Sequence, residues 1–81
     1  MRNYVKFYAV VFDVKHPKPA EIGKAAIRAV GEADITKAGV NPKGELFIFN
    51  TDKSVAYKVG VRGTKYGQLD CYAVLVKGAK A

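Results

Sequence analysis

The chain has 81 residues, of which 49% are apolar, and its fourteen basic and seven acidic residues give a net charge of +7. This length allows one domain spanning residues 1–81, and the apolar fraction excludes a disordered chain. The longest apolar run, Phe7 to Phe12, is too short to span a membrane. Lys6 and Asp13 interrupt the first apolar segment, unlike a secretory leader, so we expect a cytoplasmic protein.

The first predicted element is a strand over residues 4–14, which are rich in β-branched and aromatic residues. Every second side chain of a strand points to the same face. This alternation predicts a core face that consists of Val5, Phe7, Ala9 and Val11. It predicts a partly exposed face that consists of Tyr4, Lys6, Tyr8 and Val10.

The second predicted element is an amphipathic helix over residues 19–33, which follows a loop at residues 15–18. Pro19 suits the first helical position, where no N–H is needed, and Glu21 in the first turn is favourable for the helix dipole. Apolar residues recur at helical spacing along one side, namely Ile22, Ala26, Ala29 and Ala33. The small alanine side chains on this side allow close packing on a sheet.

Two short strands follow, over residues 35–40 and 45–50, and the turn-forming residues 41–44 between them predict a hairpin. Near the end of the chain, residues 63–68 predict a loop and residues 69–77 predict a final strand.

The segment 52–62 is ambiguous, and the name of the fold depends on it. Its valines and Tyr57 alternate with small or polar residues, which favours a strand, whereas Thr51 or Asp52 could cap a short helix. A helix gives the element order of the ferredoxin-like, split βαβ fold. A strand gives a β-α-β-β-β-β variant. In both cases we predict an α+β fold with a single small antiparallel sheet and one main helix.

Residues that could support catalysis are few and scattered along the sequence. No cluster of His, Cys, Asp and Glu has metal-ligand spacing, so we expect neither a metal nor a cofactor. The single cysteine, Cys71, lies in a strand-like run and is expected to be a small buried apolar residue. The single histidine, His16, is expected in a surface loop. The sequence therefore favours a binding protein over an enzyme.

Positive charge is concentrated towards the end of the chain, where residues 53–81 contain six basic residues, Lys80 among them, and one acidic residue. Several basic residues lie next to tyrosines in the sequence. Lysines neutralise phosphates and tyrosine rings can stack on unpaired bases, so this combination predicts an RNA-binding surface. The candidate RNA-binding residues fall into two groups, Lys6, Tyr8, Lys15 and Lys18 in the first and Lys58, Arg62, Lys65, Tyr66 and Lys77 in the second.

Several segments of the chain resemble a known protein family. They are the opening strand Tyr4 to Val14, the pairs Glu21-Ile22 and Gly31-Glu32 of the helix, Thr36-Lys37-Ala38, and the basic end Val74 to Lys80. Together these segments resemble the small, ferredoxin-like protein subunits of archaeal and eukaryotic ribonuclease P.

This resemblance implies a role in tRNA processing as one subunit of a ribonucleoprotein. The RNA subunit would perform the phosphodiester chemistry. The protein would stabilise the folded, structured RNA by placing positive charge along its backbone, together with other protein subunits.

Other interpretations remain open from the sequence. The chain could be a protein-interaction module, an inhibitor or adaptor that binds an acidic protein through an exposed sheet edge. A homodimer is compatible with such an edge. A small hydrolase without a recognisable motif is a third alternative.

Overall fold

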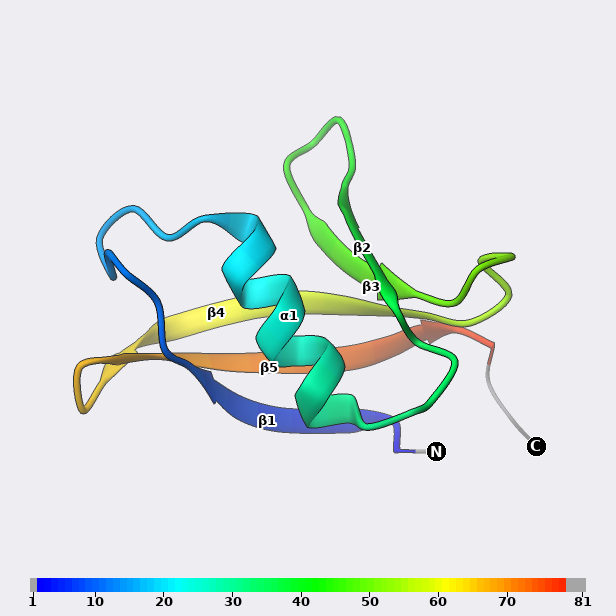
Figure 1. Cartoon of the computed structure of the whole chain (residues 1–81), viewed down its shortest axis with the longest axis horizontal. Coiled ribbons are helices and arrows are strands. Elements are labelled where there is room, and N and C mark those ends of the chain that lie inside the picture. Colours follow the sequence, from blue (N-terminus) through cyan, green and yellow to red (C-terminus); the bar gives the residue numbers. More distant parts are fainter. Residues whose placement is uncertain (1, 79–81) are drawn as a thin grey trace.

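The computed structural model describes residues 2–78, which form a five-stranded sheet with a helix across one face (Figure 1). Lys80, counted above in the basic end of the chain, lies outside the described residues. In chain order the elements are β1 (Tyr4–Ala9), α1 (Pro19–Val30), β2 (Lys37–Val40), β3 (Leu46–Phe49), β4 (Ala56–Lys65) and β5 (Gln68–Lys77).

The strands lie in the order β1-β5-β4-β3-β2, and every neighbouring pair is antiparallel. Four of them, β2 to β5, form a meander, while β1 pairs with β5 at the far edge. The helix therefore connects the two opposite edges of the sheet, β1 on one side and β2 on the other (Figure 1). The predicted α+β class, with one antiparallel sheet and one main helix, is confirmed for the described chain.

The ambiguous segment 52–62 contributes a strand and not a helix, because Ala56–Lys65 is β4. Alternation explains this outcome: Tyr57 and Val59 are buried, with Lys58 between them half-exposed on the other face. The element order is thus the β-α-β-β-β-β variant. The ferredoxin-like arrangement, which needs a second helix, is not confirmed.

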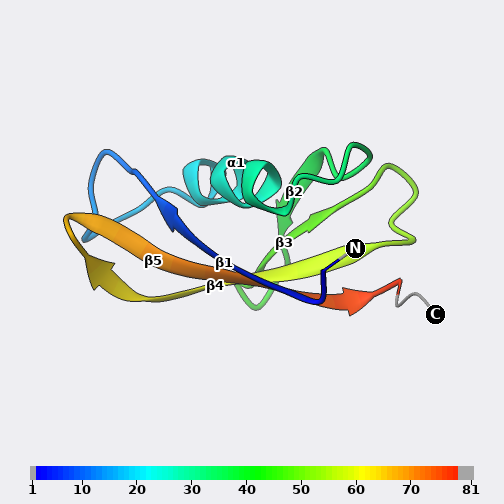
Figure 2. The same ribbon diagram turned by 90° about the horizontal axis from the view of Figure 1, so that it is seen from below.

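The core lies between the helix and one face of the sheet (Figure 2). The largest fully buried side chains are those of Tyr57, Ile35, Ile48 and Cys71. Gly23 lets the helix approach β2, since a Cβ added there would lie 2.9 Å from the Cβ of Ala38. Burial of Cys71 confirms the sequence prediction and raises the pKa of its thiol to about 11.

Four predicted elements are shorter in the structure, and for the hairpin strands β2 and β3 the difference is only one or two residues at an end. The strand expected over residues 4–14 ends at Ala9, and residues 10–18 form a loop in which the Phe12 N–H donates to the Glu21 carboxylate at 3.2 Å. The helix expected to end at residue 33 ends at Val30. Gly31 adopts a left-handed conformation with φ 71°, and its N–H donates to the Ile27 carbonyl.

The loop expected at residues 63–68 is instead a tight hairpin turn. β4 continues to Lys65 and β5 begins at Gln68, so that only Tyr66 and Gly67 form the turn. Their φ angles, 55° and 75°, are both positive, as a two-residue turn matched to the twist of a hairpin requires. In the part of the chain that the structure describes, no helix is long and apolar enough to cross a membrane.

Candidate nucleic-acid interface

The sheet has one face covered by α1 and one face that no described element covers, which we call the open face (Figure 2). Because Val5, Phe7 and Ala9 are buried towards the helix, the alternate residues of β1 lie on the open face. Cross-strand pairing extends this assignment to the other strands. The open face carries Tyr4, Lys6 and Tyr8 of β1, Asp70, Tyr72 and Val74 of β5, Lys58 and Gly60 of β4, Phe47 and Phe49 of β3, and Lys37 and Gly39 of β2.

Two tyrosines on adjacent strands, Tyr4 of β1 and Tyr72 of β5, stack on the open face and are called the tyrosine pair. Their ring centroids are 5.9 Å apart and their planes differ by 15°. The guanidinium carbon of Arg62 lies 5.8 Å from each ring centroid, and this guanidinium donates a hydrogen bond to the Tyr4 hydroxyl. The three side chains therefore form one flat, cationic aromatic cluster.

Irregular pairing of β4 brings Arg62 to this cluster. Val61 pairs with Cys71 and Gly63 pairs with Asp70, so Arg62 is an extra residue at a β-bulge. Bulges change the direction of a side chain relative to regular pairing. Here the guanidinium lies over two rings from two other strands.

Gly60 provides the space in which the Tyr72 ring lies. A Cβ at this position would overlap the end of that ring, so the tyrosine lies directly over the β4 backbone. The absence of a side chain at Gly60 therefore keeps the ring low on the sheet, with one side towards solvent.

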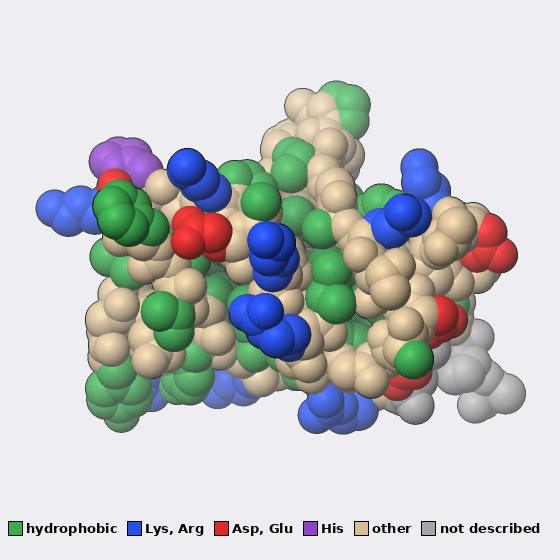
Figure 3. Space-filling model, in the orientation of Figure 1, with side chains coloured by type: hydrophobic (Ala, Val, Ile, Leu, Met, Phe, Trp, Pro, Cys, Tyr) green, Lys and Arg blue, Asp and Glu red, His purple; other side chains and the backbone are tan. Residues whose placement is uncertain are grey.

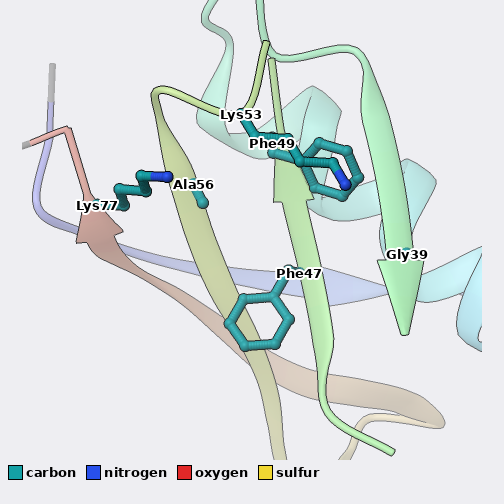
Figure 4. A pocket seen from close by; sticks show the side chains of 6 residues that line it. All are labelled: Gly39, Phe47, Phe49, Lys53, Ala56 and Lys77. Carbon is teal, nitrogen blue, oxygen red and sulfur yellow. The ribbon is translucent and has the colours of Figure 1, made fainter. Parts of the chain in front are cut away.

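A second aromatic group lies on the β2 side of the open face. Phe47 and Phe49 of β3, with Gly39, Lys53, Ala56 and Lys77, line a shallow hollow of about 270 Å³ that we call the phenylalanine hollow (Figure 4). Lys53 lies over Phe49, with Nζ 5.5 Å from the ring centroid. Lys77 extends from the end of β5 towards Ala56 (Figure 4).

The open face is strongly basic. Among the described residues, three acidic side chains adjoin it or lie at its margin, Glu45, Asp52 and Asp70, whereas the basic side chains there are Lys6, Lys37, Lys53, Lys58, Arg62, Lys65 and Lys77. By contrast, the helix-bearing side shows basic and acidic side chains interspersed (Figure 3).

One of these cations is paired within the protein. Lys58 Nζ lies 2.8 Å from a carboxylate oxygen of Glu45. Hydrogen bonds from Lys58 and then from Asn41 hold the pKa of Glu45 below its ordinary value. In return, the hydrogen bond to Glu45 raises the pKa of Lys58. At neutral pH both groups are charged, so Glu45 partly neutralises the centre of the open face.

Most of the candidate RNA-binding residues are brought together. Lys6, Tyr8, Lys58, Arg62 and Lys77 lie on the open face, and Lys65 and Tyr66 form its end at the β4–β5 turn, where Lys65 Nζ is 5.5 Å from the Tyr66 ring centroid.

The first predicted group, however, is divided by the structure. Lys15 and Lys18 lie on the loop that connects β1 to the start of α1. They therefore lie outside the strand that carries Lys6 and Tyr8, which ends at Ala9.

The prediction also omitted residues that belong to this face. Phe47, Phe49 and Tyr4 follow from alternation once the neighbouring residues are known to be buried, so the sequence contained a signal for them. Gly60 and Lys53 depend on contacts with residues of other segments, and no sequence pattern indicates those contacts.

The single cysteine and the single histidine lie in different surroundings. Cys71 is buried, and His16 is exposed in its loop, as predicted, with Nδ1 3.5 Å from the Asp13 carboxylate. Residues 2–78 contain no group of three or more His, Cys, Asp or Glu side chains that could hold a metal ion.

The chain matches no protein-family model, no curated protein and no solved structure. The resemblance to ribonuclease P subunits therefore stays a prediction from sequence.

Proposed function

We propose that the protein binds unpaired RNA across the open face of its sheet. The observation that carries this proposal is the tyrosine pair with Arg62, a flat cationic aromatic cluster on a basic, uncovered sheet. Bases stack on aromatic rings and on guanidinium planes, while lysines neutralise the neighbouring phosphates. A lysine for a phosphate and an aromatic ring for a base lie side by side here, since Lys6 pairs directly with Tyr72 across the strands.

Unpaired nucleotides fit this face better than a continuous duplex. In a duplex the bases are stacked on one another and their faces are inaccessible, so the tyrosine rings would have nothing to stack against. In a single strand each stacked base contributes about 1–3 kcal/mol, independently of its identity. The proposal therefore places loops, bulges or single strands of an RNA on the open face.

A narrower form of this proposal follows from the sequence resemblance. The protein would be a subunit of a ribonucleoprotein of the ribonuclease P type, holding a structured RNA through such unpaired segments while the RNA performs the tRNA processing reaction. The positive charge of the open face supports RNA contact in general. The specific ribonucleoprotein rests on the resemblance alone.

One observation favours a second candidate function. The outer edge of β1 pairs with no strand among residues 2–78, which leaves backbone groups able to pair with another chain. A partner strand from an acidic protein, or from a second copy of this chain, could extend the sheet there. Such binding would use the edge and would not require the aromatic rings of the open face.

The test compares two double variants that lose the same charge from opposite sides of the molecule. Lys6→Ala with Arg62→Ala removes two cations from the open face, and Lys24→Ala with Arg28→Ala removes two exposed cations from α1. Fluorescence anisotropy with a short single-stranded RNA should show weakened binding for the first variant and near wild-type binding for the second.

Salt adds an independent measurement. With about six phosphate contacts to a single strand, affinity should fall by ~300-fold between about 50 and 200 mM salt. The proposal would be refuted if the wild-type protein did not bind the RNA at low salt, or if the two double variants lost RNA affinity equally. Binding of an acidic protein that both variants retain would instead support the β1 edge.

A further inference from the structure

The phenylalanine hollow is separate from the tyrosine pair, because Lys58 and Val74 lie between them on the intervening strands. We propose that this hollow holds one unstacked base of the bound strand, with Lys53 and Lys77 contacting the phosphates on its two sides. This inference rests on the proposed function and assigns a distinct base pocket within the same face.

The floor of the hollow is shaped by small residues beside the two phenyl rings. Gly39 of β2 pairs with Phe47, and Ala56 of β4 pairs with Phe49. The Phe49 ring extends over Gly39, where an added Cβ would lie 3.5 Å from the ring. Larger side chains at these two positions would fill the space, so their small size leaves a flat apolar depression.

The size of the hollow suits a single ring system. Its volume of about 270 Å³ is below the roughly 300–1,000 Å³ of pockets for drug-sized ligands. In Figure 4 the Phe49 ring lies towards Gly39 of β2 and the Phe47 ring lies towards β4. One planar base can lie on this apolar surface, whereas a larger cofactor would extend beyond it.

The charge around the hollow indicates a phosphate-bearing ligand. Two of its six lining residues are lysines and none is acidic. The neighbouring Asp52 carboxylate accepts a hydrogen bond from the Ser54 N–H at 3.0 Å; hydrogen bonds from the side chain and then the backbone of Ser54, with a smaller contribution from the charge of Lys77, lower its pKa. An aromatic side chain of a protein partner would match the rings but would not use the two lysines.

Backbone geometry supports a dedicated position for Lys53. It has a positive φ of 61°, which non-glycine residues rarely adopt, and its N–H donates to the Asn50 carbonyl at 3.0 Å. From this turn the Lys53 side chain extends so that its ammonium group lies over the Phe49 ring. A lysine held above an aromatic ring at the rim of a hollow can contact a phosphate without leaving its place.

The test is a double-mutant cycle between the RNA and the protein. A set of short single-stranded RNAs, each lacking the base at one position, is titrated against the wild-type protein and against Phe49→Leu, which keeps apolar volume but loses the ring. In the wild type, loss of the base that occupies the hollow should weaken binding by about 5- to 150-fold. In Phe49→Leu that penalty should largely vanish, while penalties at the other positions persist.

Val40→Ala is the matched control, because Val40 is exposed on the same edge of the sheet but its pairing with Leu46 places it on the helix-bearing face. It should leave every penalty unchanged. Thermal unfolding of each variant checks that the sheet is intact. Replacing Lys53 and Lys77 by glutamine should each make the salt dependence shallower by ~0.7 in the log–log slope.

The outcomes separate this inference from the proposed function. If RNA binds and the open-face variants weaken it, but Phe49→Leu leaves all penalties unchanged, the hollow holds no base and the inference is wrong. If the wild-type protein binds none of the RNAs, both proposals are wrong. If a peptide rich in aromatic and acidic residues shifts the Phe49 ring signals in NMR and RNA does not, the hollow is a protein-binding site instead.

Discussion

The Tyr72 ring can lie directly over the β4 backbone because Gly60 has no side chain. Gly60→Ala would force the ring away from β4, which should destabilise the fold by about 1–3 kcal/mol. The displaced ring would also leave the tyrosine pair, so RNA affinity should fall. Chemical denaturation and anisotropy measure the two effects. Gly63→Ala is the control on the same strand, since nothing lies within 4 Å of an added Cβ there; similar losses in both variants would contradict the proposed role of Gly60.

Cys71 gives the fold a dependence on alkaline pH. Burial raises its pKa from 9.0 to about 11, so the folded chain keeps a proton that the unfolded chain loses first. The free energy of unfolding should therefore decrease as the pH rises from 9 towards 11. Cys71→Ala should flatten this decrease, as measured by denaturation at a series of pH values. If the free energy of unfolding of the variant decreased with pH as steeply as that of the wild type, groups other than Cys71 would cause the decrease.

At the scale of single residues, the sequence predicted only some members of the site. Lysines and tyrosines were recognised by type, and Lys58, Arg62 and Tyr8 do lie on the open face. Lys6 and Tyr8 were grouped with Lys15 and Lys18, which lie beyond the end of β1 on the loop before α1. In the loop after Ala9, the Phe12 and Lys15 N–H groups donate to the carboxylates of Glu21 and Asp13 and not to a neighbouring strand.

At the scale of elements, β3 and β4 are linked by the ion pair between Glu45 and Lys58. Glu45→Gln should strengthen RNA binding severalfold, because Lys58 would then be free to meet a phosphate. It should also make the salt dependence steeper by ~0.7 in the log–log slope. Anisotropy at several salt concentrations measures both. Glu32→Gln, which makes the same charge change after α1, is the control; an equal gain there would show only a general effect of charge.

Residue type and turn signals predicted β1, β2, β3 and β5, whereas for β4 alternation favoured a strand but left a helix as the alternative. Buried Tyr57 resolves that ambiguity: it packs in the core and its hydroxyl donates to the Arg2 carbonyl at 2.9 Å, a contact made across 55 positions of the chain. The turn at Tyr66 was taken for a loop because a tyrosine with positive φ is not a usual turn residue.

At the scale of the whole molecule, the order of the strands could not be predicted from the sequence. Pairing of β1 with β5 joins the two ends of the described chain, and local propensity contains no information about such distant pairs. This pairing nevertheless creates the tyrosine pair, since Tyr4 and Tyr72 come from those two strands. The chemistry of the site was therefore visible in the sequence, while its assembly was not.

The place of β1 has a consequence for how the chain folds. Residue 3 lies beside residue 75, three positions before the end of the described chain, because Tyr4 pairs with Val74 and the Leu75 N–H donates to the Asn3 carbonyl at 2.8 Å. A circular permutant that joins residue 78 to residue 3 by a short linker and opens the chain between residues 10 and 18 would turn the sheet into a meander of sequential strands. Its contact order would be lower, so stopped-flow refolding should be faster than for the natural order of the chain. An unchanged rate would mean that β1 docks after the rate-limiting step, with the four-stranded meander and helix already in place.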